Sequence, residues 1–310
     1  MQIKDYPLTN YLADDDFLLV QTTSDNAFKS IKASTVKAYC GGASSSSTSS
    51  TFLLDNVLGV VSARSLRKLK TSYTGKAVKT ILSDGTSQDI DFTSSNIIDV
   101  AALKSFAGNG NAFVNKIYDQ IGGLDISQST FSSCPKIVSN GLVITAANKP
   151  TLSFNNSFLS GSIPCGYPIT IIAVVEIFGS TNGAFIKCGN TSSGLGIGVG
   201  SGNFDNPGTT LVGLDETVAW LNTSGNFTTN SLAIAEINCD GSNFSMYLNG
   251  IQVESGSAGI VPPSQTYSVG GYSSRLPICN ISEDIVFNLV ISSTTRSAIV
   301  QNMKEYYSIS

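Results

Sequence analysis

The residues that could carry out chemistry in this chain are acidic, because the chain contains no histidine. Histidine is the usual general base and the commonest metal ligand, so its absence argues against zinc sites and Ser-His-Asp catalysis. Any catalysis would therefore rest on carboxylates. The acidic residues of the second half of the chain are Glu176, Asp205, Asp215, Glu216, Glu236, Asp240, Glu254, Glu283 and Asp284.

Glycoside hydrolysis is the chemistry that a pair of carboxylates would support. It needs two acids roughly 5 to 10 Å apart across a cleft. Glu176 and Glu236 fall inside predicted strands, where an inward carboxylate could lie in a groove or, alternatively, each could face solvent. No catalytic motif links them. We therefore assign no catalytic residue and expect a protein that is not an enzyme, with hydrolysis of a surface polysaccharide as an alternative.

The cysteines give no sign of a metal or redox centre. All six occur singly, and no CxxC pair exists. The N-terminus also lacks a basic region followed by an apolar run, so we expect a reducing compartment and mostly buried, free thiols. We predict no metal and no cofactor. The six residues are Cys40, Cys134, Cys165, Cys188, Cys239 and Cys279.

A sugar-binding site is indicated by aromatic residues that lie near polar ones. Such sites place an aromatic platform beside amide and carboxylate groups. The single tryptophan is close in sequence to an aspartate and an asparagine, and a second loop supplies a tyrosine and an arginine. The alternative is a tryptophan in the core or in an interface. The predicted ligand-binding residues are Trp220, Asp215, Asn222, Tyr272 and Arg275.

Two further segments could be mistaken for nucleotide or nucleic-acid sites. Gly194–Gly202 alternates glycine with aliphatic residues, which predicts a strand and not a phosphate-binding loop. Ser62–Tyr73 has apolar residues every three or four positions, which predicts an amphipathic helix with a solvated basic face. The net charge is −4 and no aromatics interleave with the basic residues, so we expect no nucleic-acid partner.

The elements that must position these residues are mainly strands. From Leu142 to the end, apolar runs are bounded by Gly, Asn, Ser and Pro. Asn249-Gly250 between alternating apolar runs predicts a tight hairpin. Helices are predicted over Ile97–Phe106 and Thr294–Tyr307. The longest apolar stretch, Ile169–Val175, is too short to span a membrane.

The order of these elements resembles a concanavalin/laminin-G-like jelly roll. The expected fold is therefore mainly β, a jelly-roll sandwich over residues 52–310 with a few short helices. Residues 41–51 are a Ser-rich linker. Residues 1–40 are too few to bury a core of their own, so they are expected to dock on a partner.

The N-terminal segment resembles that of bacteriophage tail-fibre and virion-fibre proteins. The pattern is carried by Leu12, Asp15, Phe17 to Gln21, Lys29, Ile31, Ser34 and Val36. The resemblance implies a virion protein of the tail, baseplate or head, assembled in the host cytoplasm as a homotrimer. Docking on other virion proteins would use Leu12, Phe17, Leu18, Leu19, Val20, Ile31 and Val36.

A second resemblance covers roughly residues 58–129. Val61–Val78, Ser83-Asp84, Gln88–Phe92 and Val114–Gly122 are similar to the start of the fungal α-L-arabinofuranosidase B catalytic domain and of related phage modules. The family's catalytic carboxylates and its adjacent cysteine pair match nothing in this chain. The resemblance therefore implies a fold and not an activity.

Together these features predict a virion fibre that presents a lectin-like domain to a host-surface glycan. Weak binding at each site would be strengthened by multivalency. A structural or decoration protein without receptor binding is the alternative.

Overall fold

The computed structural model separates the chain into two units, Met1–Ser50 and Thr51–Ser310. In the first unit, β1 (Phe17–Gln21) and β2 (Phe28–Lys32) form an antiparallel hairpin in which Phe17 pairs with Lys32. Of the predicted docking residues, Leu12 and Val36 lie outside the described residues, and the others fall in these two strands. The structure describes residues 17–21, 28–32, 52–179, 181–189, 194–201, 207–215, 219–257, 264–271 and 276–310.

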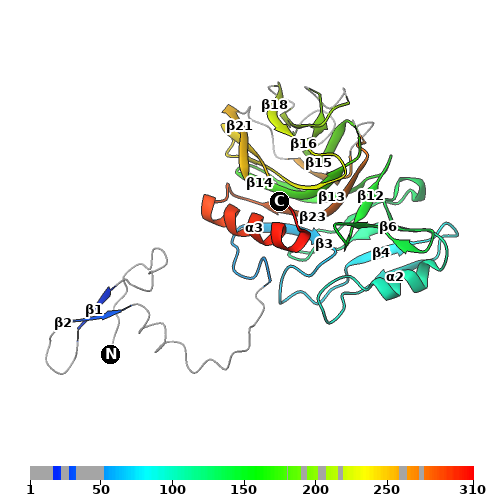
Figure 1. Cartoon of the computed structure of the whole chain (residues 1–310), viewed down its shortest axis with the longest axis horizontal. Coiled ribbons are helices and arrows are strands. Elements are labelled where there is room, and N and C mark those ends of the chain that lie inside the picture. Colours follow the sequence, from blue (N-terminus) through cyan, green and yellow to red (C-terminus); the bar gives the residue numbers. More distant parts are fainter. Residues whose placement is uncertain are drawn as a thin grey trace. The chain divides into compact units, whose positions relative to one another are not determined.

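The second unit is a β-sandwich of jelly-roll type, which confirms the predicted fold class. Nineteen of its described strands are connected by antiparallel pairing into one sheet. This sheet bends into two layers that face each other, as Figure 1 shows. A smaller group of strands extends from one end of the sandwich.

The first layer is built around two long central strands, β14 and β23, which are buried except at Glu176. β14 pairs with β19 on one side and with β23 on the other, and β23 also pairs with β3 and β12. The layer contains β3 (Val60–Ser65), β12 (Leu152–Phe154), β14 (Ile169–Ile177), β19 (Leu232–Cys239), β20 (Asn243–Leu248), β21 (Ile251–Ser257) and β23 (Cys279–Phe287).

The second layer packs against the inner face of the first. Its strands are joined in the order β7, β13, β22, β15, β16, β17 and β18. Their bounds are β7 (Ile126–Ser127), β13 (Leu159–Cys165), β15 (Gly183–Gly189), β16 (Gly194–Gly200), β17 (Thr210–Asp215), β18 (Ala219–Asn226) and β22 (Ser264–Val269).

The smaller group of strands continues the sheet from β7. β4 lies between β5 and β6, and β6 also pairs with β7 and β8. A 3-10 turn, η1 (Phe131–Ser133), precedes β8. The bounds are β4 (Val78–Ile81), β5 (Ser87–Ile90), β6 (Ala112–Ile117), β8 (Lys136–Ser139) and β9 (Leu142–Val143). β10 (Thr145–Ala146) and β11 (Lys149–Pro150) form a separate two-stranded antiparallel sheet.

Two helices cover parts of the sheet. α2 (Val100–Ala107) packs on the smaller group of strands and begins at Asp99, whose carboxylate accepts a hydrogen bond from the Ala102 N–H. α3 (Ser293–Tyr307) is capped by Ser292 in the same way. Both helices were predicted from sequence, and both are confirmed. Among the described residues, no helix has the length and apolar character that a membrane span requires.

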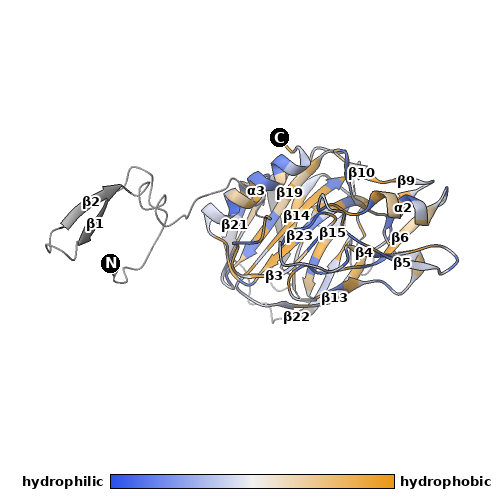
Figure 2. Cartoon of the chain, turned by 90° about the horizontal axis from the view of Figure 1, so that it is seen from below, coloured by the Kyte–Doolittle hydropathy of each residue, from blue (hydrophilic) through white to orange (hydrophobic). Residues whose placement is uncertain are grey.

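The core is divided by the first layer. One apolar cluster fills the space between the two layers and extends under α2. A second cluster lies between the outer face of the first layer and α3, and includes Ile172, Val174, Ile285 and Met303. Figure 2 shows the hydrophobic colouring concentrated on the central strands. Both faces of β14 and β23 are largely shielded from water, which explains the nearly continuous apolar sequence of β14. β23 also carries buried polar residues, and these have hydrogen-bond partners on neighbouring elements.

The predicted helix over Ser62–Tyr73 is wrong. The segment begins as strand β3, which pairs with β23, and continues as an irregular chain. Arg64 and Arg67 were expected on a solvated face, but both are buried. The helical spacing of the apolar residues was overridden because β3 completes the first layer and its arginines find buried acids there.

Two other local predictions are confirmed. Leu248 pairs with Ile251 across a two-residue turn, and Asn249 and Gly250 both have the positive φ that this turn type requires. The glycine-rich segment forms strand β16, with Leu195, Ile197 and Val199 in the core. It is not a phosphate-binding loop.

Candidate functional site

An arginine and an aspartate lie buried between the two layers. The Arg64 guanidinium forms an ion pair with Asp284, and its Nε donates to Asp284 Oδ1 at 3.2 Å. The Tyr267 hydroxyl donates to the same carboxylate at 2.8 Å. Burial alone would lower the pKa of Arg64, but the charge of Asp284 more than compensates and raises it above its usual value. Asp284 is therefore neutralised inside the sandwich.

The neighbouring acid, Glu283, faces the opposite side of β23. Arg67 holds it with two hydrogen bonds of 2.8 and 3.0 Å, and the hydroxyls of Ser65 and Tyr307 donate to it at 2.9 and 3.1 Å. Successive residues of a strand point to opposite faces, so Glu283 lies under α3 and Asp284 lies between the layers. Glu283 is only 1% exposed.

Glu236 on β19 has the same kind of partner. The Arg296 Nε, from α3, donates to both of its carboxylate oxygens at 2.8 and 2.9 Å, and the guanidinium stacks on the Tyr247 ring. Burial raises the pKa of Glu236, and the Arg296 charge offsets only part of this effect. Glu236, Glu283 and Asp284 are all buried and paired with arginine, so they stabilise the packing of the two layers and of α3. For the same reason they cannot exchange protons with an external substrate.

Glu176 differs from the other three acids of the central strands. It lies at the end of β14, is partly exposed, and forms no ion pair with the described residues. The Asn280 side chain on β23 donates to its Oε2 at 2.7 Å, and the two residues are paired in the sheet register. Glu176 is therefore oriented by a neutral amide and not by a counter-ion.

The Asn280 side chain beside Glu176 has an unsatisfied hydrogen-bond acceptor within the described part of the chain. Asn280 is 3% exposed, and its Oδ1 has no hydrogen-bond partner among the described residues. Its amide orientation is fixed, because the carboxylate of Glu176 requires the NH₂ group on its side. A buried acceptor without a partner carries a desolvation penalty. The Glu176 carboxylate is therefore the accessible acceptor of this pair, whereas the Asn280 Oδ1 is enclosed.

Asp119 and Gln120, from the segment similar to arabinofuranosidase B, are structural. Asp119 accepts hydrogen bonds from Ser62 Oγ and from the backbone N–H of Ala63, Gly122 and Leu124. The Gln120 side chain bonds the backbone after β3 through three further hydrogen bonds. These two side chains close the loop after β6 onto β3.

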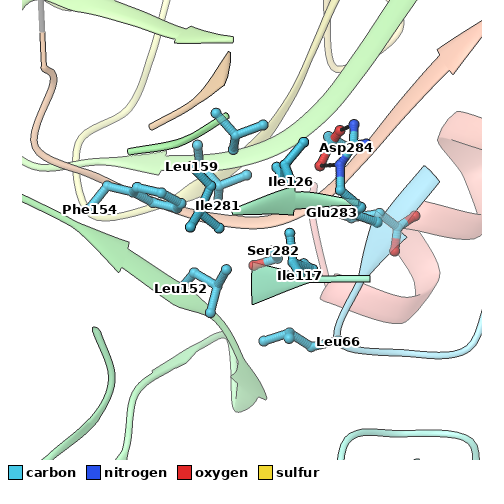
Figure 3. A pocket seen from close by; sticks show the side chains of 12 residues that line it. Leu66, Ile117, Ile126, Leu152, Phe154, Leu159, Ile281, Ser282, Glu283 and Asp284 are labelled. Carbon is cyan, nitrogen blue, oxygen red and sulfur yellow. Dashed lines mark hydrogen bonds and ion pairs between the residues drawn. The ribbon is translucent and has the colours of Figure 1, made fainter. Parts of the chain in front are cut away.

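A cavity beside the Arg64–Asp284 pair is too small for a sugar. Its volume is about 10 Å³, which is room for one water molecule. Figure 3 shows apolar side chains, including Leu152, Phe154 and Ile281, around it, with Asp284 at one edge. Small-molecule sites are typically on the order of 300–1,000 Å³. This cavity is a packing defect of the core.

The predicted sugar-binding residues are only partly placed. Asp215 is in β17, and Trp220 and Asn222 are in β18; the register pairs Trp220 with Leu214, Asn222 with Val212, and Asp215 with Ala219. Adjacent strands thus bring the three backbone positions together. Tyr272 and Arg275 lie outside the described residues. The assignment of these five residues to a ligand site stays a prediction.

Several important residues were missed by sequence reasoning. Asn280 was not singled out from the sequence, and nothing local links it to Glu176, which is 104 positions away. Mostly free thiols were expected, but Cys188 is disulfide-bonded, whereas Cys134, Cys239 and Cys279 are buried thiols outside any disulfide. Within the described part of the chain, no three His, Cys, Asp or Glu side chains are grouped so as to hold a metal.

Comparison with solved structures identifies similar folds. A GH54 α-L-arabinofuranosidase soaked with a cyclic sulfate inhibitor matches with a TM-score of 0.61 and 14% identity. A mutant of a GH54 α-L-arabinofuranosidase soaked with 4-nitrophenyl α-L-arabinofuranoside gives 0.62 and 15%. An arabinofuranosidase complexed with arabinofuranosyl-α-1,2-xylobiose gives 0.58 and 15%.

Each of these alignments covers 79% of this chain but 62% of the other chain, so this protein spans less than two thirds of the enzymes it resembles. No protein-family model and no curated protein sequence matches the chain. At this level of identity, the structural likeness establishes the fold alone.

The comparison corrects two expectations. The interpretation as a bacteriophage fibre for host attachment is wrong, because the similar structures are glycoside hydrolases and not virion proteins. The expectation of a protein without enzymatic activity is corrected on the same finding. The N-terminal pattern that suggested a fibre is short and degenerate, and the shared architecture of residues 52–310 outweighs it.

Proposed function

We propose that this protein processes carbohydrate as a glycoside hydrolase, with α-L-arabinofuranosides as the first substrate class. The observation that carries the proposal is the fold, which matches α-L-arabinofuranosidases over 79% of the chain. Fold alone does not determine activity, so the proposal also needs a suitable carboxylate.

Glu176 is the carboxylate that we assign to the reaction. Glycoside hydrolysis typically uses two carboxyl groups, one that protonates the leaving group and one that acts as base or nucleophile, and we assign Glu176 as one of the two. Glu176 is accessible and is oriented by Asn280, whereas Glu236, Glu283 and Asp284 are buried against arginines.

The test is hydrolysis of 4-nitrophenyl α-L-arabinofuranoside by the full chain and by Glu176→Gln. We expect release of 4-nitrophenol by the unaltered protein and a fall in kcat of at least about 10²-fold in the variant, because a positioned acid or base contributes about 10²–10⁴-fold. Glu254→Gln is the matched control, since Glu254 is a partly exposed acid on the edge strand β21.

Two outcomes contradict the proposal. If neither this substrate nor arabinose-substituted xylo-oligosaccharides are hydrolysed, the protein is not an enzyme of this class. If hydrolysis occurs but is equally fast in Glu176→Gln, another carboxylate carries the reaction. Circular dichroism of the variant excludes unfolding as the cause of a loss.

A further inference from the structure

The small group of strands β4, β5, β6 and β8 has one buried side and one side without a helix. Side chains that point to the buried side, such as Val78, Ile90 and Val114, are fully inaccessible. α2 packs over this side, as Figure 1 shows near β4 and β6. The alternating residues all reach solvent. We call this second surface the open face and define it by Lys79, Asp89, Phe113, Lys116, Tyr118 and Lys136.

The sheet register places these residues side by side. Lys79 of β4 pairs with Asp89 of β5 and with Lys116 of β6. In the next row, Phe113 pairs with Lys136 of β8. The row through Lys116 continues to Ser127 and then to Ser160 of the sandwich, so polar residues run across five neighbouring strands.

Aromatic rings form an apolar platform within this polar surface. Phe113 packs edge-on against Phe131, with ring centroids 4.9 Å apart. Both rings are partly exposed. The Lys136 ammonium lies 5.7 Å from the Phe113 ring, and the Lys116 ammonium lies 5.3 Å from the Tyr118 ring. A sugar ring can stack on such a platform while its polar groups reach the lysines.

The lysines exceed the carboxylates available to them. The Tyr118 hydroxyl donates to Asp89 at 2.7 Å, and Lys116 lies 3.5 Å from Asp125. Lys79 and Lys136 form no ion pair with any described residue. Two ammonium groups on this surface are therefore free to bind anionic groups.

A β-bulge interrupts β6 between Lys116 and Phe113. Lys79 pairs with Lys116 but Thr80 pairs with Val114, so Asn115 is an extra residue in β6. Its side-chain oxygen is buried and has no partner among the described residues. Bulges of this kind occur preferentially next to functional sites, where they redirect side chains.

We propose that the open face binds an acidic saccharide, that is, a glycan that bears carboxylate groups. The proposal rests on the carbohydrate role inferred above and gives it a second contact surface, separate from Glu176. Lys79 and Lys136 contact the saccharide carboxylates, Phe113 and Tyr118 contact the sugar rings, and the serine hydroxyls at the edge contact its hydroxyl groups.

The test is isothermal titration of the full chain with a short oligogalacturonide and with an uncharged oligogalactan of the same length. We expect saturable binding of the acidic oligosaccharide only, weakening as salt is raised because exposed charge contacts are screened. The double variant Lys79→Ala with Lys136→Ala should weaken binding by about tenfold. Lys104→Ala, which alters an exposed lysine of α2 on the opposite side, should leave it unchanged.

Equal binding of the uncharged oligosaccharide, no binding of the acidic one, or full affinity in the double variant would each overturn the proposal. Both substitutions are at accessible positions, and an unchanged melting temperature shows that the variant is folded. The outcome is independent of hydrolysis. If the protein binds the acidic oligosaccharide through these lysines but has no arabinofuranosidase activity, the binding proposal stands and only the hydrolase proposal is rejected. If the protein hydrolyses arabinofuranosides but does not bind the acidic oligosaccharide, only the binding proposal is rejected.

Discussion

Arg64 and Asp284 are 220 positions apart in the chain, yet they lie directly opposite each other on β3 and β23. Both are almost fully buried. This ion pair joins the first strand of the sandwich to its last. Arg67, in the segment just after β3, forms a second ion pair with Glu283 on the other face of β23.

Removing the charge of Asp284 should strongly destabilise the protein. Asp284→Asn keeps the shape but leaves the Arg64 charge buried without a counter-ion, which costs about 3–5 kcal/mol. The free energy of unfolding, from urea titration followed by circular dichroism, measures the loss. Asp91→Asn is the control, because its pair with Lys76 is exposed and should contribute about 1 kcal/mol or less. Similar losses for the two variants would contradict this prediction.

Stability should fall in alkaline solution because of two buried tyrosines. Burial, and then the charges of Asp284 and Glu283, raise the pKa of Tyr267 and of Tyr307 well above the ordinary value of 10.0. The folded state therefore keeps protons that the unfolded chain releases above pH 10. This contribution is fully present below that pH and is lost as pH rises from there towards the folded-state pKa values.

Urea titrations on either side of that pH measure this effect, and absorbance of tyrosinate shows when each tyrosine ionises. Tyr307→Phe should have a smaller pH dependence, since it lacks one of the two hydroxyls. A free energy of unfolding that does not change across this range would show that neither tyrosine is protected.

The cysteines should react in two distinct steps. Burial raises the pKa of the Cys134 thiol to about 11 and also raises the pKa of Cys279, so few thiolates exist at neutral pH. Iodoacetamide should label Cys134, Cys239 and Cys279 only after denaturation. Cys188 should need reduction as well. Peptide mass spectrometry distinguishes the steps, and labelling of Cys188 without reductant would contradict the disulfide.

Alanine substitutions at two glycines should distinguish the energetic cost of backbone strain from that of steric overlap. Gly85 and Gly270 have φ values of +87° and +86°, so alanine is strained at both. Nothing lies within 4 Å of an added Cβ at Gly85, but at Gly270 it would lie 1.9 Å from the Phe154 ring. We expect Gly85→Ala to destabilise by about 1–2 kcal/mol and Gly270→Ala by about 1–3 kcal/mol more. Equal losses in thermal unfolding would show that the Phe154 ring moves aside without cost.

Local sequence was sufficient for elements whose geometry depends on near neighbours. The hairpin at Asn249-Gly250 follows from two residues that accept positive φ. The helix predicted over Ile97–Phe106 is α2, and the structure shows that Asp99 caps its first turn. The alternation of glycine and aliphatic residues predicted β16. The sandwich followed from the order of such elements, since apolar strands must cover one another.

The candidate sites could not be obtained in this way. Glu176 was recognised as a possible inward carboxylate, but its partner Asn280 is on a strand far along the chain. The open face depends on register, because Phe113 and Lys136 become neighbours only when β6 pairs with β8. No periodicity within one strand contains that information.

The segment from Ser62 to Tyr73 shows which features the sequence determined and which the tertiary structure determined. Sequence alone determined that its apolar residues would be buried and that β-rich layers would form around them. Tertiary structure decided that the segment begins as a strand and that Arg64 and Arg67 lie inside. The physical reason is that helix propensity contributes less than about 1 kcal/mol per residue, whereas pairing with β23 satisfies a full row of backbone hydrogen bonds and brings each arginine to a buried acid.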